Sequence, residues 1–377
     1  MSEGLDRRAF LRQAIGAVGW SLAIPLFAAC APAAAPSPTA APTEAPKPTE
    51  VAKPVAPAAP VAAPAATAAP AAPANVTKLT YAMVTYSPYH IVPIVTSEKP
   101  DLMRKFGLEL DIVVTNNSPN SVNAMVGGSV HAAGVTPESA WPAQAQTPDV
   151  QQIAALANGT PYQLFVNPDI KQVADLKGKS VGASATRGGA DTTAMQILLL
   201  ENGLKEGDYS IVQVGPIAER TAAMKAGTIS GCAQQEPQSS QLREAGFVEL
   251  DDADNYPALK NVQTLVLISR KSWYEANPEV ALGLLRAWID VTRWVYDPKN
   301  KDELLGIIAR TLKVEQKAAE NAYQRWWIKA QTAPLAPRVD LKMAAQHAEN
   351  QKKVGNANVP ADFARLVDNS LIEKALA

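Results

Sequence analysis

Proline is concentrated in one segment near the start of the chain. This segment separates the first 30 residues from the rest of the chain, so the two cannot share a hydrophobic core. Between Ala31 and Ala74 the sequence holds 20 Ala and 12 Pro. Proline removes amide donors and clashes with the preceding helical turn, so extended polyproline-like backbone is left. We predict a disordered Ala/Pro-rich stalk over residues 31–75 and a folded part that starts at Val76.

The first 30 residues have the layout of an export signal. The pair Arg7-Arg8 precedes an uncharged run over residues 14–29, which is short of the about 20 residues that a membrane-spanning helix needs. The arginine pair resembles the twin-arginine signal, which exports proteins that have already folded. We therefore predict an exported protein whose signal is residues 1–30.

The end of this signal, Leu26-Phe27-Ala28-Ala29-Cys30, resembles a bacterial lipobox. Families with this motif are cleaved before the cysteine, which is then lipidated, although Phe27 stands where Leu is usual. The resemblance implies that Cys30 anchors the protein in the cell membrane and that the stalk tethers an extracytoplasmic folded part to the lipid bilayer. Ordinary signal-peptide cleavage after Ala29 is the alternative.

Charge and motif content argue against several classes of function. Lys+Arg 35 and Asp+Glu 36 leave a net charge of -1, so we exclude nucleic acid as the main partner. His90, His131 and His347 have no partner at metal-ligand spacing, so no metal site is supported. The sequence contains no nucleophile elbow, phosphate loop or dinucleotide fingerprint. We expect no catalytic residue and no cofactor, and a binding protein rather than an enzyme.

From Val76 onward, short apolar runs alternate with segments of helical period, which predicts an α/β protein with largely parallel sheets. Among the helices, residues 192–202 should end at Gly203 and residues 217–225 at Gly227, because glycine readily takes the left-handed conformation that closes a helix. The tail after Ser272 shows only helical period, and we expect it to pack on the first lobe. Strands are expected at residues 79–84, 108–115, 130–135, 150–156, 180–183, 210–214, 229–233 and 247–250, with crossings between lobes at 162–166 and 262–268.

Polar residues gather in the loops that follow the predicted strands, where open α/β sheets bind ligands. Helix N-termini in these loops expose amides that can hold an anion or a carbonyl, although plain helix capping accounts for the same residues. The candidate ligand-binding residues are Ser87, Tyr89, Asn117, Ser118, Thr136, Thr186, Arg187, Gly188, Gly189, Asp191 and Glu236.

Two segments resemble a known family. Residues 173–182, VADLKGKSVG, are similar to the DLKGKxVG entry into the second lobe of solute-binding proteins of ABC importers. Residues 219–231, followed by Gln235-Glu236-Pro237, resemble a segment of the nitrate, sulfonate, taurine and thiamine-precursor branch, with Ser230 where Asp is frequent. The resemblance extends over residues 76 to about 327.

This resemblance implies a type II periplasmic-binding-protein fold with two lobes, a hinge and a C-terminal helical extension. Lobe 1 would comprise residues 76–165 and 262–377, and lobe 2 residues 166–261. It also implies a monomer that binds a small-molecule ligand and delivers it to ABC permease subunits. A periplasmic enzyme and a ligand sensor on the same fold are the alternatives.

The ligand class stays open between two possibilities. Arg187 lies in a Gly-rich loop before a predicted helix, where its guanidinium could donate two parallel hydrogen bonds to one oxyanion. That position favours a small organic anion, such as a sulfonate, taurine or a nitrate-like ion. Aromatic side chains near the expected cleft favour instead a pyrimidine thiamine precursor or another aromatic compound that stacks on them. These side chains are Tyr86, Tyr89, Trp141 and Tyr162.

The lipobox gives the first testable prediction. Cys30→Ser should release the protein from membranes, because serine cannot carry the thioether-linked lipid, and it should leave the folded part intact. Membrane fractionation of the host measures the bound share, and a thermal melt checks the fold. An unchanged membrane-bound share would contradict the lipid anchor.

Overall fold

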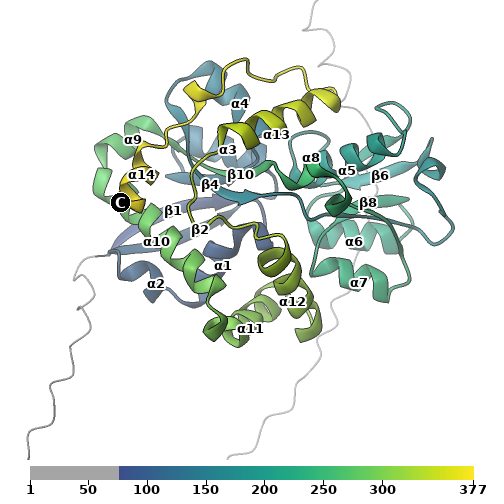
Figure 1. The fold of residues 1–377 in the computed structure, drawn as a ribbon, viewed down its shortest axis with the longest axis horizontal. Helices are drawn as coiled ribbons and strands as arrows, with labels where there is room; N and C mark the ends of the chain where they lie inside the picture. The colour runs from purple at the N-terminus through teal and green to yellow at the C-terminus, as the bar shows by residue number, and fades with distance from the viewer. Residues whose placement is uncertain (1–75) are drawn as a thin grey trace, which may run out of the picture. The chain divides into compact units, whose positions relative to one another are not determined.

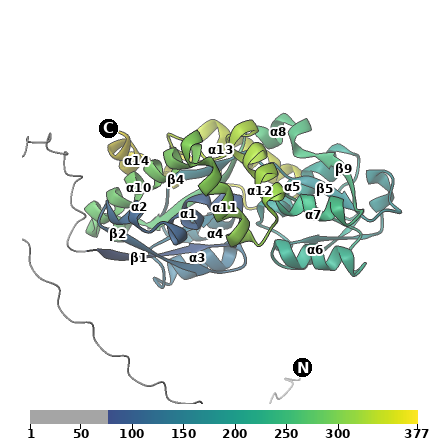
Figure 2. The ribbon, with the colours of Figure 1, turned by 90° about the horizontal axis from the view of Figure 1, so that it is seen from below.

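The computed structural model describes residues 76–377, which form two lobes that each contain one five-stranded sheet (Figure 1). The predicted export signal, Cys30 and the stalk over residues 31–75 lie outside the described residues. The two sheets lie side by side, as the view from below also shows (Figure 2). Within residues 76–377, no helix is both long enough and apolar enough to cross a membrane.

The sheet of the first lobe has the strand order β2-β1-β3-β10-β4. Strand β1 runs parallel to β2 and β3, whereas β10 runs antiparallel to β3 and β4. The carboxyl ends of the three parallel strands therefore meet at one edge, which faces the second lobe. The bounds are β1 Thr77–Met83, β2 Leu108–Val114, β3 Ala132–Val135, β4 Val150–Asn158 and β10 Gln263–Arg270.

The sheet of the second lobe has the order β7-β6-β8-β5-β9 and repeats this plan. Strand β6 is parallel to β7 and β8, and β5 is antiparallel to β8 and β9. All ten segments predicted as strands or crossings form strands, but β5 and β10 make both sheets mixed rather than largely parallel. The bounds are β5 Gln163–Val166, β6 Ser180–Ala183, β7 Ser210–Gln213, β8 Gly231–Gln234 and β9 Val248–Asp252.

Helices cover both sheets, and the two predicted from a closing glycine are confirmed. Helices α5 (Ala190–Glu201) and α6 (Ile217–Lys225) are followed by Gly203 and Gly227, which have φ of 87° and 68°. The left-handed backbone that ends each helix favours glycine there. The other helices are α1 Ile91–Glu98, α2 Asp101–Arg104, α3 Ser118–Val126, α4 Pro137–Gln146, α7 Gln238–Glu244, α8 Pro257–Lys260, α9 Lys271–Ala276, α10 Pro278–Tyr296, α11 Lys301–Leu312, α12 Gln316–Tyr323, α13 Leu341–Lys353 and α14 Ser370–Leu376.

The core of the first lobe holds the short helix η1 (Pro88–His90) in place. Tyr81 on β1 is fully buried, and its hydroxyl lies 3.3 Å from Nδ1 of His90. A Cβ on Gly134 of β3 would lie 2.1 Å from that hydroxyl, so only glycine lets β3 pass. The buried tyrosine thus fixes the histidine and, through it, the loop that faces the second lobe.

The C-terminal helices contact both lobes, which corrects the expectation that they pack on the first alone. Helices α10 and α11 cover lobe 1, where Arg310 pairs with Glu98 at 3.0 Å. Helix α12 and the π-helix η5 (Gln324–Lys329) instead reach lobe 2, where Asn321 donates to the Ser240 hydroxyl and Trp326 Nε1 to the Glu236 carbonyl. The tail therefore ties the two lobes together near the hinge.

An ion pair at this junction is partly buried. The guanidinium of Arg325 donates to both oxygens of Asp252, at 2.9 and 2.6 Å, and its Nε donates to the Pro161 carbonyl at 3.1 Å. Burial raises the pKa of Asp252, but hydrogen bonds from Arg325 and from the amide of Asp254 outweigh it, so the pKa lies below its usual value. The charged pair therefore stabilises the fold at neutral pH.

We expect Arg325→Met to lower the free energy of unfolding at neutral pH by about 2 to 4 kcal/mol, because Asp252 would keep its charge, lose both hydrogen bonds of its main counter-charge and retain only the weaker attraction of Lys329. The loss should shrink as the pH falls through the folded-state pKa of Asp252, since the protonated side chain needs no partner. Urea unfolding at neutral and acid pH measures both effects.

Arg338→Met is the matched control, because its pair with Glu373 is exposed and should contribute little to stability. A loss for Arg325→Met that is as large at acid pH as at neutral pH would contradict the assignment.

Candidate functional site

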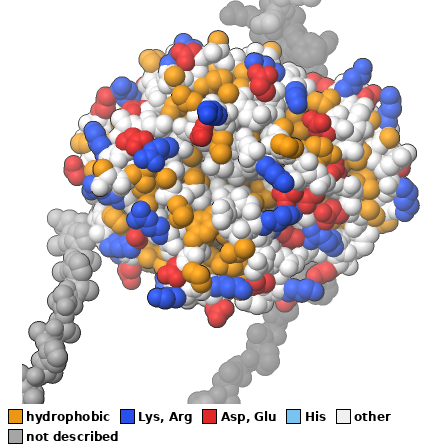
Figure 3. Space-filling view, viewed as in Figure 1, with side chains coloured by type: hydrophobic (Ala, Val, Ile, Leu, Met, Phe, Trp, Pro, Cys, Tyr) orange, Lys and Arg blue, Asp and Glu red, His pale blue; other side chains and the backbone are white. Residues whose placement is uncertain are grey.

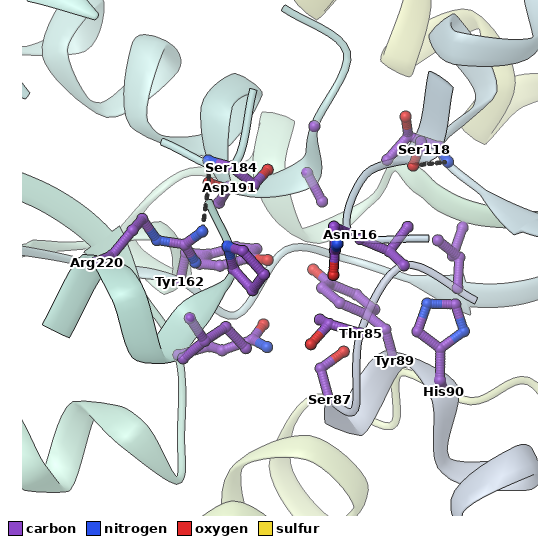
Figure 4. A pocket seen from close by; sticks show the side chains of 18 residues that line it. Thr85, Ser87, Tyr89, His90, Asn116, Ser118, Tyr162, Ser184, Asp191 and Arg220 are labelled. Atoms are coloured by element: carbon purple, nitrogen blue, oxygen red, sulfur yellow. Dashed lines mark hydrogen bonds and ion pairs between the residues drawn. The ribbon is translucent and has the colours of Figure 1, made fainter. Parts of the chain in front are cut away.

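A cavity lies between the two sheets and is lined by residues of both lobes (Figure 4). It encloses about 500 Å³ of space, which includes its open mouth. The polar and aromatic lining residues are Thr85, Ser87, Tyr89, His90, Asn116, Ser118, Thr136, Tyr162, Ser184, Asp191, Arg220 and Gln235.

Four α-helices begin at this cavity, two from each lobe. Helix α3 begins at Ser118 and α4 follows Thr136, while α5 follows Gly189 and α6 follows Pro216. Neither Gly189 nor Pro216 caps its helix with a side chain. A helix N-terminus carries partial positive charge and free amides, so this arrangement attracts acceptor oxygens.

The charged side chains that line the cavity are Asp191 and Arg220, and they form a buried ion pair. Nη1 of Arg220 lies 3.0 Å from Oδ2 of Asp191, and both side chains are less than a tenth exposed. Asp191 also accepts from the amide and hydroxyl of Ser184, at 2.8 and 2.6 Å. Each carboxylate oxygen of Asp191 therefore accepts at least one hydrogen bond.

Arg220, in contrast, keeps hydrogen-bonding capacity. Nη1 also donates to the Gly215 carbonyl at 3.1 Å, and Nη2 makes one long contact of 3.5 Å to Gln234. Buried Nε has no partner within residues 76–377. A guanidinium carries five N–H donors and a carboxylate about four lone-pair sites, and the contacts above use three of each, so the ion pair has more spare donors than spare acceptors.

The wall from lobe 1 faces this pair with small polar side chains (Figure 4). Thr85, Ser87 and Asn116 line it, and their side chains make no hydrogen bond to another side chain or backbone group of residues 76–377. Asn116 has a left-handed backbone with φ of 70°, which asparagine tolerates better than most residues. This backbone conformation directs the side-chain amide of Asn116 toward the cavity and away from helix α3, which follows it.

Aromatic side chains make up the rest of the wall. The rings of Tyr89 and Tyr162 lie 6.0 Å apart, and Trp326 packs edge-on against Tyr89 at 4.5 Å. Burial raises the pKa of both tyrosines and lowers the pKa of His90 to about 3, so all three are neutral at physiological pH. The net side-chain charge of the lining is therefore zero, because Asp191 and Arg220 cancel.

The structure brings together six of the residues that sequence analysis singled out as ligand contacts. They come from four different loops, three in lobe 1 and one in lobe 2, and they lie around one cavity. These six residues are Ser87, Tyr89, Ser118, Thr136, Gly189 and Asp191.

The other five candidates lie away from this cavity: Asn117, Thr186, Arg187, Gly188 and Glu236. Asn117 caps α3 by accepting from the amide of Asn120, and Glu236 is held by Arg243 at 2.5 Å. The carbonyl of Gly188 accepts from the Ser139 hydroxyl of lobe 1 at 2.9 Å, and Arg187 is 60% exposed and pairs with Glu206 at 2.7 Å. Arg220, not Arg187, is therefore the arginine in the cavity.

Sequence analysis missed Arg220 because it sought ligand contacts only in the loops that follow strands, whereas Arg220 lies inside helix α6. The buried residues of this helix are Ile217, Arg220, Thr221 and Met224, which recur at the three- and four-residue spacing of one helical face. A charged residue on an apolar face is a signal that the sequence contained. Asn116 and Thr85 gave no such signal, since only the backbone conformation decides which loop residue faces the cavity.

Two aromatic residues expected near the cleft also lie elsewhere. Tyr86 is 39% exposed, and Trp141 is buried against His347 and Phe363. Within residues 76–377, no three or more His, Cys, Asp or Glu side chains are grouped so as to hold a metal ion.

Comparisons with known proteins agree with this geometry. The model of the NMT1-like family matches residues 72–309, more than half of the chain. The nitrate/nitrite binding protein NrtA of Synechococcus elongatus is 29% identical over 150 residues, which are 38% of this chain and 33% of NrtA. The match thus spans about a third of the length of that relative.

Two solved structures show the fold. The alkanesulfonate-binding protein SsuA from Xanthomonas axonopodis pv. citri, bound to MOPS, has a TM-score of 0.60 at 18% identity over 80% of this chain and 99% of SsuA. The periplasmic nitrate-binding protein NrtA from Synechocystis PCC 6803 has a TM-score of 0.63 at 15% identity over 80% of this chain and 88% of that protein. The predicted two-lobed periplasmic-binding-protein fold is confirmed.

Proposed function

Because the chain belongs to the NMT1-like family, we propose that it is an extracytoplasmic receptor that binds a small organic anion between its lobes and delivers it to an ABC importer. Its relatives and structural neighbours include proteins named for binding nitrate and alkanesulfonates. The proposal includes a monomer whose Cys30 carries the lipid anchor and whose stalk over residues 31–75 spans the distance to the bilayer.

The observation that carries the proposal is the surplus of hydrogen-bond donors in the cavity. Each Asp191 oxygen already accepts a hydrogen bond, while Nη2 of Arg220 makes only one long contact, and the amides that begin α5 and α6 have no side-chain cap. A buried donor without a partner costs free energy, so the site favours a ligand that supplies acceptors. Sulfonate, carboxylate and nitrate groups supply several.

Charge supports the same class of ligand. The Asp191–Arg220 pair contributes no net charge, so the field at the cavity comes mainly from the four helix N-termini around it. Each carries up to about half a positive charge, which is concentrated in its first turn. An anion therefore enters a positive potential without removing either member of the ion pair from its partner.

A second candidate is a neutral aromatic compound, such as a pyrimidine thiamine precursor. It is favoured by the rings of Tyr89 and Tyr162, which both line the cavity at a separation of 6.0 Å. Stacking on these rings would use the aromatic wall, and a ring nitrogen or carbonyl would accept from Arg220. Such a ligand leaves the helix N-termini without an anion, so we place it second.

The ligand can be identified by native mass spectrometry of the full chain purified from its host under mild conditions. We expect a retained small molecule that carries an acidic group. Adding that compound to stripped protein should raise the melting temperature, since a ligand that binds only the native state adds RT ln(1 + [L]/Kd) to its stability. A retained molecule without an acidic group would move the assignment to the second candidate.

Arg220→Gln should weaken binding of the retained anion by about ten- to a hundredfold, because it removes a charge-assisted hydrogen bond. The double variant Arg220→Gln/Asp191→Asn should show the same loss while it avoids an uncompensated buried carboxylate. Titration calorimetry measures the affinity, and a melt verifies that each variant is folded.

Arg187→Gln is the matched control, since it changes the same residue type in the exposed pair with Glu206 and should leave the affinity within about twofold of the native protein. Equal affinities for the folded Arg220 variants and the native chain would sink the anion site.

A further inference from the structure

Helix α13 lies across the boundary between the lobes (Figure 1). It contacts α4 of lobe 1 on one side and helices α5 and α8 on the other. Its buried residues include Ala344, His347, Ala348 and Gln351, which recur at three- and four-residue spacing and so share one face. This face is directed at the protein interior. Two of the four are polar, and each binds a different lobe.

The contact with lobe 1 is made by His347. Its Nε2 lies 2.7 Å from Oε2 of Glu138, and both side chains are at most 5% exposed. Glu138 is in the first turn of α4, the helix that follows the cavity residue Thr136. The His347 ring also packs edge-on against Trp141 of the same helix, at 5.8 Å. Helix α13 is therefore fixed to α4 close to the cavity.

The contact with lobe 2 is made one helical turn later, by Gln351. Its Nε2 donates to the hydroxyl of Thr193 at 2.8 Å, and both residues are buried. Thr193 is two residues beyond Asp191 in the first turns of α5. A further pair joins Lys353 to Glu201 at the other end of α5, at 3.6 Å. The same face of α13 thus holds one cavity-facing helix from each lobe.

We infer that α13 is an interlobe strap, in which His347 and Gln351 are positioning residues that set the distance between the N-termini of α4 and α5. This inference rests on the proposed function, because those N-termini are the ligand-binding parts of opposite walls. When the lobes separate, either the Gln351–Thr193 bond or the His347–Glu138 pair must break. The strap therefore biases the lobes toward the closed, binding-competent arrangement.

The expected size of the bias follows from one buried hydrogen bond. Losing the Gln351–Thr193 bond should shift the ratio of closed to open molecules by about two- to tenfold. Affinity should fall by a similar factor, because the apparent affinity scales with the binding-competent share of the protein once that share is small. Neither residue lines the cavity, so direct ligand contact does not account for such a change.

The test uses full-length variants on both sides of the bond. Gln351→Leu removes the donor and Thr193→Val the acceptor, each with little change in size, while Thr193→Ser retains the hydroxyl and should behave like the native chain. Lys352→Leu is the control on α13, since Lys352 is exposed and pairs with Glu349 within the same helix. If Gln351→Leu fails to fold, the comparison of Thr193→Val with Thr193→Ser still tests the hydrogen bond.

Hydrogen exchange on protein without added ligand is the first measurement. Gln351→Leu and Thr193→Val should each speed exchange of the amides in the first turns of α5 by about two- to tenfold, and the two changes together should do no more than either alone. Lys352→Leu and Thr193→Ser should match the native chain. Native exchange rates in both strap variants would overturn the inference.

Binding kinetics with methanesulfonate as the probe give the second measurement. The strap variants should release the anion about two- to tenfold faster, while Lys352→Leu should release it at the native rate. Unchanged release rates in variants that bind the probe would also overturn the strap. If the native chain does not bind this anion, the proposed ligand class fails, whereas the exchange result still decides the strap.

Discussion

The site is organised by the buried ion pair between Asp191 and Arg220. Two charges without water are costly, and a pair of this kind persists only where further hydrogen bonds satisfy both partners. Ser184 supplies two such bonds to Asp191, and the Gly215 carbonyl supplies one to Arg220. The pair thereby links the start of α5 to α6 and fixes the direction in which both helices present their amides. The polarity of the lobe 2 wall depends on it.

The first lobe provides a complementary wall by different means. Its small polar side chains are positioned by the backbone: Asn116 by a left-handed φ, and Ser87 and Tyr89 by the turn of η1. Tyr81 and His90 lock that turn from behind, through a contact that requires glycine at position 134.

The C-terminal extension bonds to both lobes and so helps to set how they are arranged. Arg325 and Trp326 hold lobe 2 close to the hinge, and α13 holds α5 nearer the cavity. Many of these contacts are polar, so separating the lobes exchanges protein hydrogen bonds for water at modest cost. The face shown in Figure 3 has acidic and basic side chains interspersed, without a continuous basic area, which fits a small solute better than a polyanion.

Local pattern alone determined much of this protein. The positions of the ten strands follow from short apolar runs, and the ends of α5 and α6 from Gly203 and Gly227, since burial and left-handed backbone act on neighbouring residues. The family motifs of residues 173–182 and 219–231 predicted the two-lobed fold, and the rule that ligands bind beyond strand ends found six cavity residues.

The tertiary structure decided which polar side chain in each loop faces the ligand cavity, because that depends on backbone angles and on contacts with distant segments. Asn116 lines the cavity while its neighbour Asn117 caps α3. Arg187 pairs with Glu206 in solvent, whereas Arg220, one helix later, is buried against Asp191. The strap is a tertiary property as well: His347 and Gln351 meet Glu138 and Thr193 across 209 and 158 residues, and no local pattern reports such a pairing.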